Sequence, residues 1–164
     1  PSEVPVWFGS RLIGALALIA GALVIVGMFL PWAKGIPNLD APAGTLSAAA
    51  SGWALMTGSG DVENATEGYA ILVFAGGIML LLGAMWGFLD PQSKTAWTTA
   101  LVGGATAVAG SAWGWVALNS YEFAGIDAAA VHISQRVGAY LTIAGGSVGV
   151  IASVIGRLGT TERL

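Results

Sequence analysis

Cysteine is absent from this chain of 164 residues. Its absence excludes disulfides, thiolate metal sites and the paired-cysteine chemistry of thiol oxidoreductases. Charge is also scarce: 9% of the residues are Asp, Glu, Lys or Arg, where a soluble domain has about 25%. Because 55% of the residues are hydrophobic, the charges are too few to cover a water-facing surface. The composition therefore predicts a membrane protein.

Four windows of the sequence contain no Asp, Glu, Lys, Arg or His, and each is about 20 to 23 residues long. A helix of this length spans a hydrocarbon core of about 30 Å. The first window is longer than the about 7 to 15 apolar residues of a secretory signal, so we expect it to stay as an anchor. The sequence predicts transmembrane helices over residues 12–33, 68–89, 96–118 and 137–156.

These windows predict an all-α fold, an integral membrane bundle of four transmembrane helices that forms a single domain over residues 1–164. Two longer connections, at about 34–67 and 119–136, would form a small extracytoplasmic cap. In the first of them, residues 35–44 are rich in Pro and Gly and predict an irregular segment. Residues 45–56 can form a short helix, capped by Thr45 or Ser47.

The absence of Asp, Glu, Lys, Arg and His from the four windows also argues against proton transfer, ion transport and haem binding within the membrane. Proton relays and ion pathways place ionisable residues at membrane depth. A b-type haem needs axial ligands such as two histidines, whereas His132 is the only histidine and lies outside the windows. The loops contain serines and acids, but no nucleophile elbow, HExxH motif or glycine-rich phosphate loop. We therefore expect no enzyme activity, no cofactor and no bound metal.

The cations outside the windows predict the orientation. An even number of crossings places both termini on one side of the membrane, and that side holds four of the six cations. The positive-inside rule then favours cytoplasmic termini in a multi-pass protein of a bacterial inner membrane. The terminal side carries Arg11, Lys94, Arg157 and Arg163, and the other side carries Lys34 and Arg136.

Small residues recur at intervals of four in the last two windows, which lets helix backbones approach closely in lipid. These rows either pack the helices within one bundle or bring another membrane polypeptide against them. Because two rows per helix exceed what one neighbour can use, the second interpretation predicts a docking surface. The residues that we expect to form it are Gly103, Ala107, Gly110, Ser111, Gly114, Gly145, Gly149 and Ser153.

Seven tryptophans are present, and six of them lie near predicted helix ends. There an indole ring meets the lipid headgroups with its apolar body in the hydrocarbon and its N–H in water. The residues that we interpret as such interface anchors are Trp7, Trp32, Trp86, Trp97, Trp113 and Trp115.

Trp53 is the exception, because it lies within the first outer loop. In a short helix, Trp53, Leu55 and Met56 would form the apolar side. Such a helix can fold over the outer ends of the bundle, lie in the membrane interface, or bind a partner. We include these three residues among the candidate docking residues.

The stretches FLPW at residues 29–32 and SGWALM at residues 51–56, followed by a second apolar window, resemble small four-helix inner-membrane proteins of actinobacteria. With its Ala- and Gly-rich helices, the chain is similar to the family of accessory proteins that includes the association factor of the cytochrome bcc–aa3 respiratory supercomplex. The resemblance implies a non-catalytic subunit without a cofactor. Its partners would be other integral membrane subunits and lipids, and not nucleic acid. The alternative is a protein that binds or transports lipid or a small hydrophobic molecule.

Overall fold

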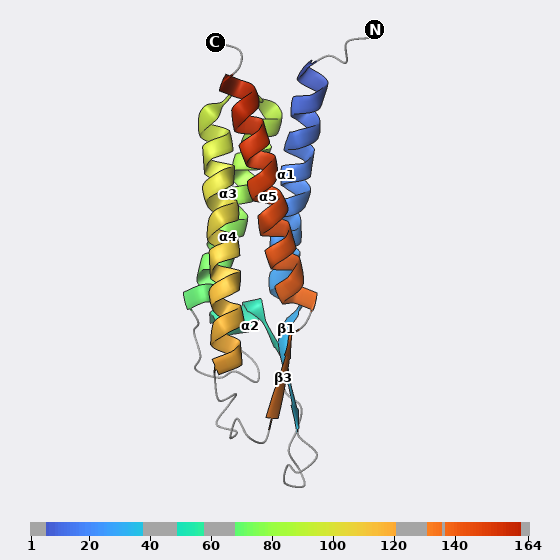
Figure 1. Cartoon of the computed structure of the whole chain (residues 1–164), viewed down its shortest axis with the longest axis vertical. Helices are drawn as coiled ribbons and strands as arrows, with labels where there is room; N and C mark the ends of the chain where they lie inside the picture. The colour runs from blue at the N-terminus through green and yellow to red at the C-terminus, as the bar shows by residue number, and fades with distance from the viewer. Residues whose placement is uncertain (1–5, 38–48, 58–67, 121–130, 136, 162–164) are drawn as a thin grey trace.

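The computed structural model describes residues 6–37, 49–57, 68–120, 131–135 and 137–161. Its main feature is a bundle of four long helices, which lie side by side along the length of the molecule (Figure 1). The helices are α1 (Val6–Phe29), α3 (Gly68–Leu89), α4 (Lys94–Ser120) and α5 (Val137–Thr161). All four are long and apolar enough to cross a membrane. The predicted all-α bundle is confirmed.

The four helices form a ring in which each packs against two neighbours. α3 lies between α1 and α4, and α5 lies between α4 and α1. Successive helices run in opposite directions, so α1 begins and α5 ends at the same end of the bundle (Figure 1). We call this end the terminal end.

The predicted helix bounds are right for α3 and differ for the others. α1 runs from Val6 to Phe29 rather than over residues 12–33, because the chain from Pro31 onward forms a strand. α4 begins at Lys94, where the hydroxyl oxygen of Ser93 accepts a hydrogen bond from the Ala96 N–H at 3.3 Å. Apolar windows mark the part of a helix that lies in lipid, whereas hydrogen bonding continues to the polar cap.

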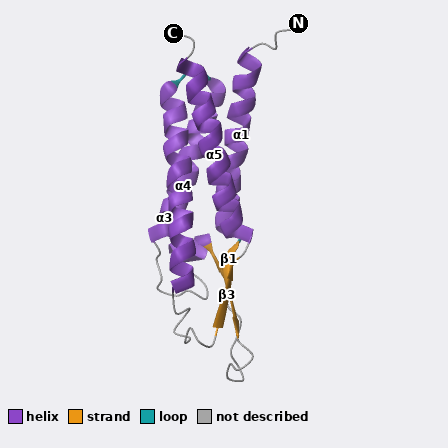
Figure 2. Cartoon of the chain, viewed as in Figure 1, coloured by secondary structure: helices purple, strands orange, loops and turns teal. Residues whose placement is uncertain are grey.

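At the other end of the bundle lies a small three-stranded sheet that the sequence did not predict (Figure 2). Its strands are β1 (Pro31–Pro37), β2 (Ala49–Ser51) and β3 (Val131–Gln135), in the antiparallel order β2-β1-β3. Residues 35–37 are therefore strand rather than irregular, and residues 38–44 lie outside the described part. We call this end of the bundle the sheet end.

A short helix, α2 (Gly52–Thr57), follows β2 directly. It covers the second half of the predicted helix over residues 45–56, and residues 49–51 are instead paired with β1. The hydroxyl oxygen of Ser51 accepts a hydrogen bond from the Ala54 N–H at 3.1 Å. Ser51 is therefore the N-cap of α2, and the predicted caps Thr45 and Ser47 lie outside the described residues.

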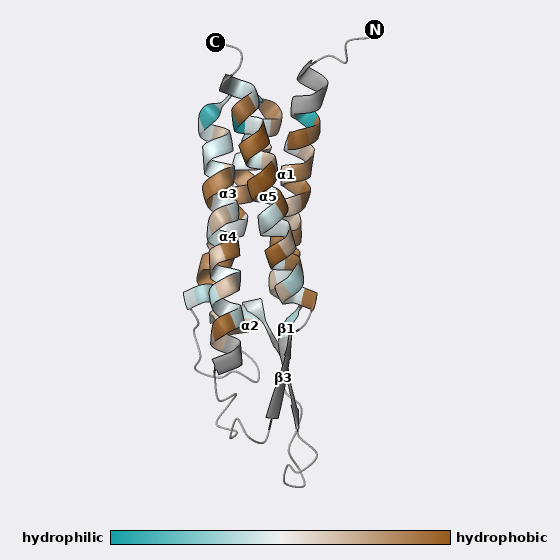
Figure 3. Ribbon diagram, viewed as in Figure 1, coloured by the Kyte–Doolittle hydropathy of each residue, from teal (hydrophilic) through white to brown (hydrophobic). Residues whose placement is uncertain are grey.

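Hydrophobic residues occur along the length of the four helices (Figure 3), and many of their large side chains are exposed. Large side chains such as Leu82, Val116 and Ile151 expose more than half of their surface. Small side chains and glycines fill much of the interior, as expected where helices pack closely in lipid. This distribution of large and small side chains suits a protein that is surrounded by hydrocarbon.

Candidate functional site

The small residues of α4 lie against neighbouring helices of the same chain. On the α3 side, a Cβ added at Gly110 would lie 2.9 Å from the Tyr69 carbonyl oxygen. A Cβ at Gly76 of α3 would lie 2.6 Å from the Ala107 nitrogen. Gly103 and Gly114 are in similarly close contact with α3 residues, through Leu80 and Tyr69. These small residues of α4 are therefore covered by α3.

Ser111 lies on the other side of α4, where α5 packs. Its hydroxyl donates a hydrogen bond of 3.1 Å to the Thr142 Oγ1, which itself donates to the Ala139 carbonyl oxygen at 2.9 Å. Both side chains are buried. This pair joins the two helices by a hydrogen bond in an apolar setting.

The small residues of α5 are likewise covered from within the chain. A Cβ at Gly145 would lie 2.7 Å from the Ala20 carbonyl oxygen of α1, and one at Gly149 would meet the Leu80 side chain of α3. Ser153 is buried and donates a hydrogen bond to the Gly149 carbonyl oxygen at 2.7 Å.

These contacts correct the prediction of a docking surface on the small-residue rows. That prediction assumed one neighbour for each helix, but the ring arrangement gives α4 and α5 two neighbours each. Both rows are then needed for packing inside the chain. The residues concerned are buried: Gly103, Ala107, Gly110, Ser111, Gly114, Gly145, Gly149 and Ser153.

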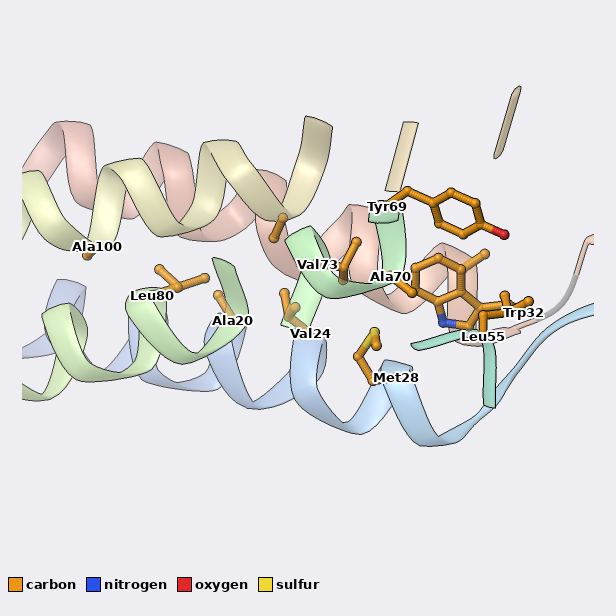
Figure 4. Packing of buried hydrophobic residues seen from close by; sticks show 12 residues of the cluster. Ala20, Val24, Met28, Trp32, Leu55, Tyr69, Ala70, Val73, Leu80 and Ala100 are labelled. Atoms are coloured by element: carbon orange, nitrogen blue, oxygen red, sulfur yellow. The ribbon is translucent and has the colours of Figure 1, made fainter. Parts of the chain in front are cut away.

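Two of the six predicted anchors are buried as well. Trp32 is 1% exposed and lies in the core beside Met28, Leu55 and Tyr69 at the sheet end (Figure 4). Trp97 is fully buried at the terminal end. Their interpretation as headgroup anchors is therefore wrong, because neither ring reaches the surface of the bundle.

Neighbouring glycines make room for both rings. Cβ atoms at Gly114 and Gly138 would come within 3.2 Å and 2.7 Å of Trp32 ring atoms, and one at Gly156 would come within 2.5 Å of the Trp97 ring. Each indole N–H also has a backbone partner. Trp32 donates to the Gly27 carbonyl oxygen at 2.9 Å, and Trp97 donates to the Pro91 carbonyl oxygen at 3.0 Å.

The other anchors are placed differently. Trp86 and Trp113 are exposed, and the half-buried Trp115 contacts Tyr140 edge to face with ring centroids 5.4 Å apart. These three positions agree with a ring at the membrane interface, which stays a prediction. The side chain of Trp7 lies outside the described ones.

The remaining candidate, Trp53, lies in a cluster of aromatic rings at the sheet end. Its ring stacks on Phe29 of α1 at a centroid distance of 5.2 Å and meets Phe74 of α3 edge to face at 5.8 Å. Phe29 is 55% exposed and Trp53 is 37% exposed. We call these three residues the outer aromatic cluster. The sequence indicated Trp53 alone, since nothing in the second predicted transmembrane helix, residues 68–89, singles out Phe74.

The other two residues of α2 hold the helix in place. Leu55 is 2% exposed and belongs to the core, and Met56 is partly buried against it. The helix contacts both α1 and α3 at the sheet end, as expected if it folds over the ends of the bundle. The expected single apolar face is therefore divided: Leu55 points into the core, while Trp53 leaves part of its ring on the surface.

The charged side chains that the structure describes lie at or near the terminal end. They are Arg11, Asp90, Lys94 and Arg157. No group of three or more His, Cys, Asp or Glu residues gathers within the described residues. The side chain of His132 and most loop acids lie outside them, so the absence of enzyme activity stays a prediction.

The four spans and the apolar outer surface define the class: the chain is a multi-pass membrane protein. Comparisons with protein-family models, with curated proteins and with solved structures found no match to it. The resemblance to respiratory accessory proteins therefore rests on the two short stretches and the topology alone.

Proposed function

We propose that this chain is a non-catalytic accessory subunit of a larger bacterial membrane complex, and that it docks through the outer aromatic cluster. The observation that carries the proposal is the position of Trp53. Its helix is already fixed by Leu55, so the bundle does not need the exposed part of the Trp53 ring for its own closure. Exposed tryptophans beside other aromatic rings are typical anchors of protein interfaces.

The packing of the bundle supports a structural role. Its helices meet through glycines whose neighbours include backbone atoms, so these contacts leave little space between the helices for a substrate. The four predicted windows contain no Asp, Glu, Lys, Arg or His that could relay protons or bind a coupling ion. A rigid bundle with an aromatic patch at one end suits a subunit that stabilises its neighbours by packing and by excluding lipid.

For the complex itself we propose a respiratory assembly of the cytochrome bcc–aa3 type, in the inner membrane of an actinobacterium. This part rests on the FLPW and SGWALM stretches. Two of their residues, Phe29 and Trp53, stack in the outer aromatic cluster, so the two stretches of the resemblance contribute to the proposed docking site.

The orientation that we propose places the terminal end in the cytoplasm. Arg11, Lys94 and Arg157 lie at or near that end and Asp90 is the one acid among the described charged side chains. An excess of cations is expected on the cytoplasmic side. The outer aromatic cluster would then lie at the extracytoplasmic face.

Purification of the tagged chain from actinobacterial membranes in a gentle detergent tests this function. We expect haem-bearing subunits to co-purify, identified by mass spectrometry and by haem bands in the visible spectrum. A chain that elutes alone and colourless under conditions that keep the respiratory complexes intact would contradict the respiratory assignment. Co-purification with colourless membrane subunits would retain the accessory role and overturn the assignment to respiration.

A further inference from the structure

The terminal end carries a surface hollow between α4 and α5, far from the outer aromatic cluster. It has a volume of about 270 Å³ and is lined by Leu101, Val154, Arg157 and Leu158. We call it the α4–α5 groove. Pockets that enclose a whole small molecule have volumes of about 300 to 1,000 Å³. A smaller, open groove suits a part of a longer ligand.

The lining combines two chemistries. Leu101, Val154 and Leu158 provide an aliphatic wall, and Val154 and Leu158 are 40% and 60% exposed. Arg157 also lines the groove and is the charged residue among its lining residues. A ligand that satisfies both needs an apolar chain joined to an anionic group.

The position of the groove in the membrane further restricts the class of ligand that it can bind. Val154 and Leu158 lie on the outer surface of a membrane-spanning helix, so a lipid tail reaches them directly from the hydrocarbon. Arg157 lies in the last turns of α5, which ends at Thr161, and therefore near the depth of the lipid headgroups. Basic groups between transmembrane helices at this depth attract anionic headgroups.

An arginine near the C-terminus of a helix also has a simpler role. It interacts favourably with the partial negative charge of the last carbonyl groups, and it can extend towards the headgroup layer. That role requires no hollow lined by the arginine. The α4–α5 groove is the additional observation that points to a ligand.

We propose that the α4–α5 groove binds one anionic glycerophospholipid, with an acyl chain along Leu101, Val154 and Leu158 and the phosphate on Arg157. The site is independent of the proposed docking role, because it lies at the opposite end of the bundle.

Native mass spectrometry of the full-length chain in detergent tests this site. The chain is offered equal amounts of dioleoyl phosphatidylglycerol and dioleoyl phosphatidylcholine, which share acyl chains and differ in headgroup charge. One cation near a membrane surface contributes about 1 kcal/mol, so we expect about fivefold more bound phosphatidylglycerol. Equal retention of the two lipids by the unaltered chain would overturn the proposal.

Substitutions separate the contribution of Arg157 from that of the general positive charge. Arg157→Gln should remove the preference for phosphatidylglycerol, whereas Arg157→Lys should keep most of it. Lys94→Gln is the matched control, because Lys94 is an exposed cation of the same end that does not line the groove. Equal losses in Arg157→Gln and Lys94→Gln would show diffuse attraction and contradict a defined site.

Two further measurements test the lipid tail. Leu101→Trp should fill the groove and lower retention of both lipids, and unchanged retention would contradict the proposed position of the acyl chain. Excess inorganic phosphate should not displace the bound phosphatidylglycerol. If phosphate displaces it, the site recognises the phosphate group alone and the proposal of a phospholipid site is wrong.

Discussion

The two ends of the bundle are closed in the same way but expose different chemistry. At the sheet end, the buried ring of Trp32 lies among glycines and donates its N–H to the Gly27 carbonyl oxygen. At the terminal end, Trp97 does the same with the Pro91 carbonyl oxygen. Beyond these rings, the sheet end exposes the outer aromatic cluster, and the terminal end carries cations and the α4–α5 groove.

The buried tryptophans at the two ends contribute to stability, whereas the exposed residues at each end are the candidates for binding. A large flat ring is needed at each end because the glycines that let the helices approach leave space that only such a ring fills. Beyond the two rings, Trp53 and Phe29 leave part of their surface uncovered by the described residues. The two proposals rest on the difference between the ends: a protein partner is proposed for the sheet end and an anionic phospholipid for the terminal end.

The largest expected effect concerns the side of the membrane on which each end lies. Because the chain has no cysteine, single cysteines can be introduced at the exposed positions Thr57, at the sheet end, and Gln92, at the terminal end. A membrane-impermeant maleimide should label Thr57→Cys in intact spheroplasts and Gln92→Cys only after lysis. The reverse pattern would contradict cytoplasmic termini.

Removal of the two buried tryptophans should have the next largest effect. We expect Trp32→Ala and Trp97→Ala each to lower the free energy of unfolding by about 3–5 kcal/mol, because each leaves a cavity and removes a hydrogen bond to a backbone carbonyl oxygen. Unfolding in mixed micelles with increasing dodecyl sulfate measures the loss. Trp86→Ala is the control, since that ring is 48% exposed. A loss as large in the control would remove the distinction between closing and exposed rings.

Glycine substitutions should distinguish the two ends. A Cβ at Gly138 would lie 2.6 Å from the Leu30 carbonyl oxygen, whereas one at Gly156 would meet the Trp97 ring. Backbone cannot move aside as readily as a side chain, so Gly138→Ala should cost more than Gly156→Ala, within about 1–3 kcal/mol. The same unfolding assay applies. Gly159→Ala is the control and should not lower the free energy of unfolding, because its Cβ would meet no atom within 4 Å. A larger loss for Gly156→Ala than for Gly138→Ala would contradict the described packing.

The hydrogen bond between α4 and α5 should contribute least. Thr142→Val keeps the shape of the side chain and removes the acceptor of the Ser111 hydroxyl. Hydrogen bonds between transmembrane helices contribute about 0.6 kcal/mol on average, so we expect a loss below about 1 kcal/mol in the same titration. A loss above about 2 kcal/mol would show that this pair, rather than glycine packing, holds α4 and α5 together.

The four spans could be predicted because the absence of charge is a local property of the sequence. The small sheet could not, since β1 pairs with β3 although α2, α3 and α4 lie between them in the sequence. Residues such as Ala49 and Ala50 also show no alternation of polar and apolar side chains. The cap of α2 was missed for the same reason, because Ser51 becomes the N-cap only where β2 ends.

The candidate site was predicted in part. Trp53 was identified because no rule for membrane interfaces explains a tryptophan within a loop. Trp32 and Trp97 were misinterpreted because a tryptophan at the end of a span gives the same pattern whether its ring faces lipid or the interior. The glycine rows could be assigned to partners only once the order of the helices was known, and Gly110 shows this: its close neighbour is Tyr69 of α3.

Replacement of Trp53 tests the docking role most directly. Tagged Trp53→Ala and Trp86→Ala are purified in parallel from native membranes, and haem absorbance per tagged chain is compared with that of the unaltered protein. A central tryptophan contributes about 2 kcal/mol or more to an interface, so Trp53→Ala should recover at least about tenfold less haem, with its fold intact in the unfolding assay. Trp86→Ala should recover an unchanged amount. Full recovery of haem by a folded Trp53→Ala would contradict docking through the outer aromatic cluster.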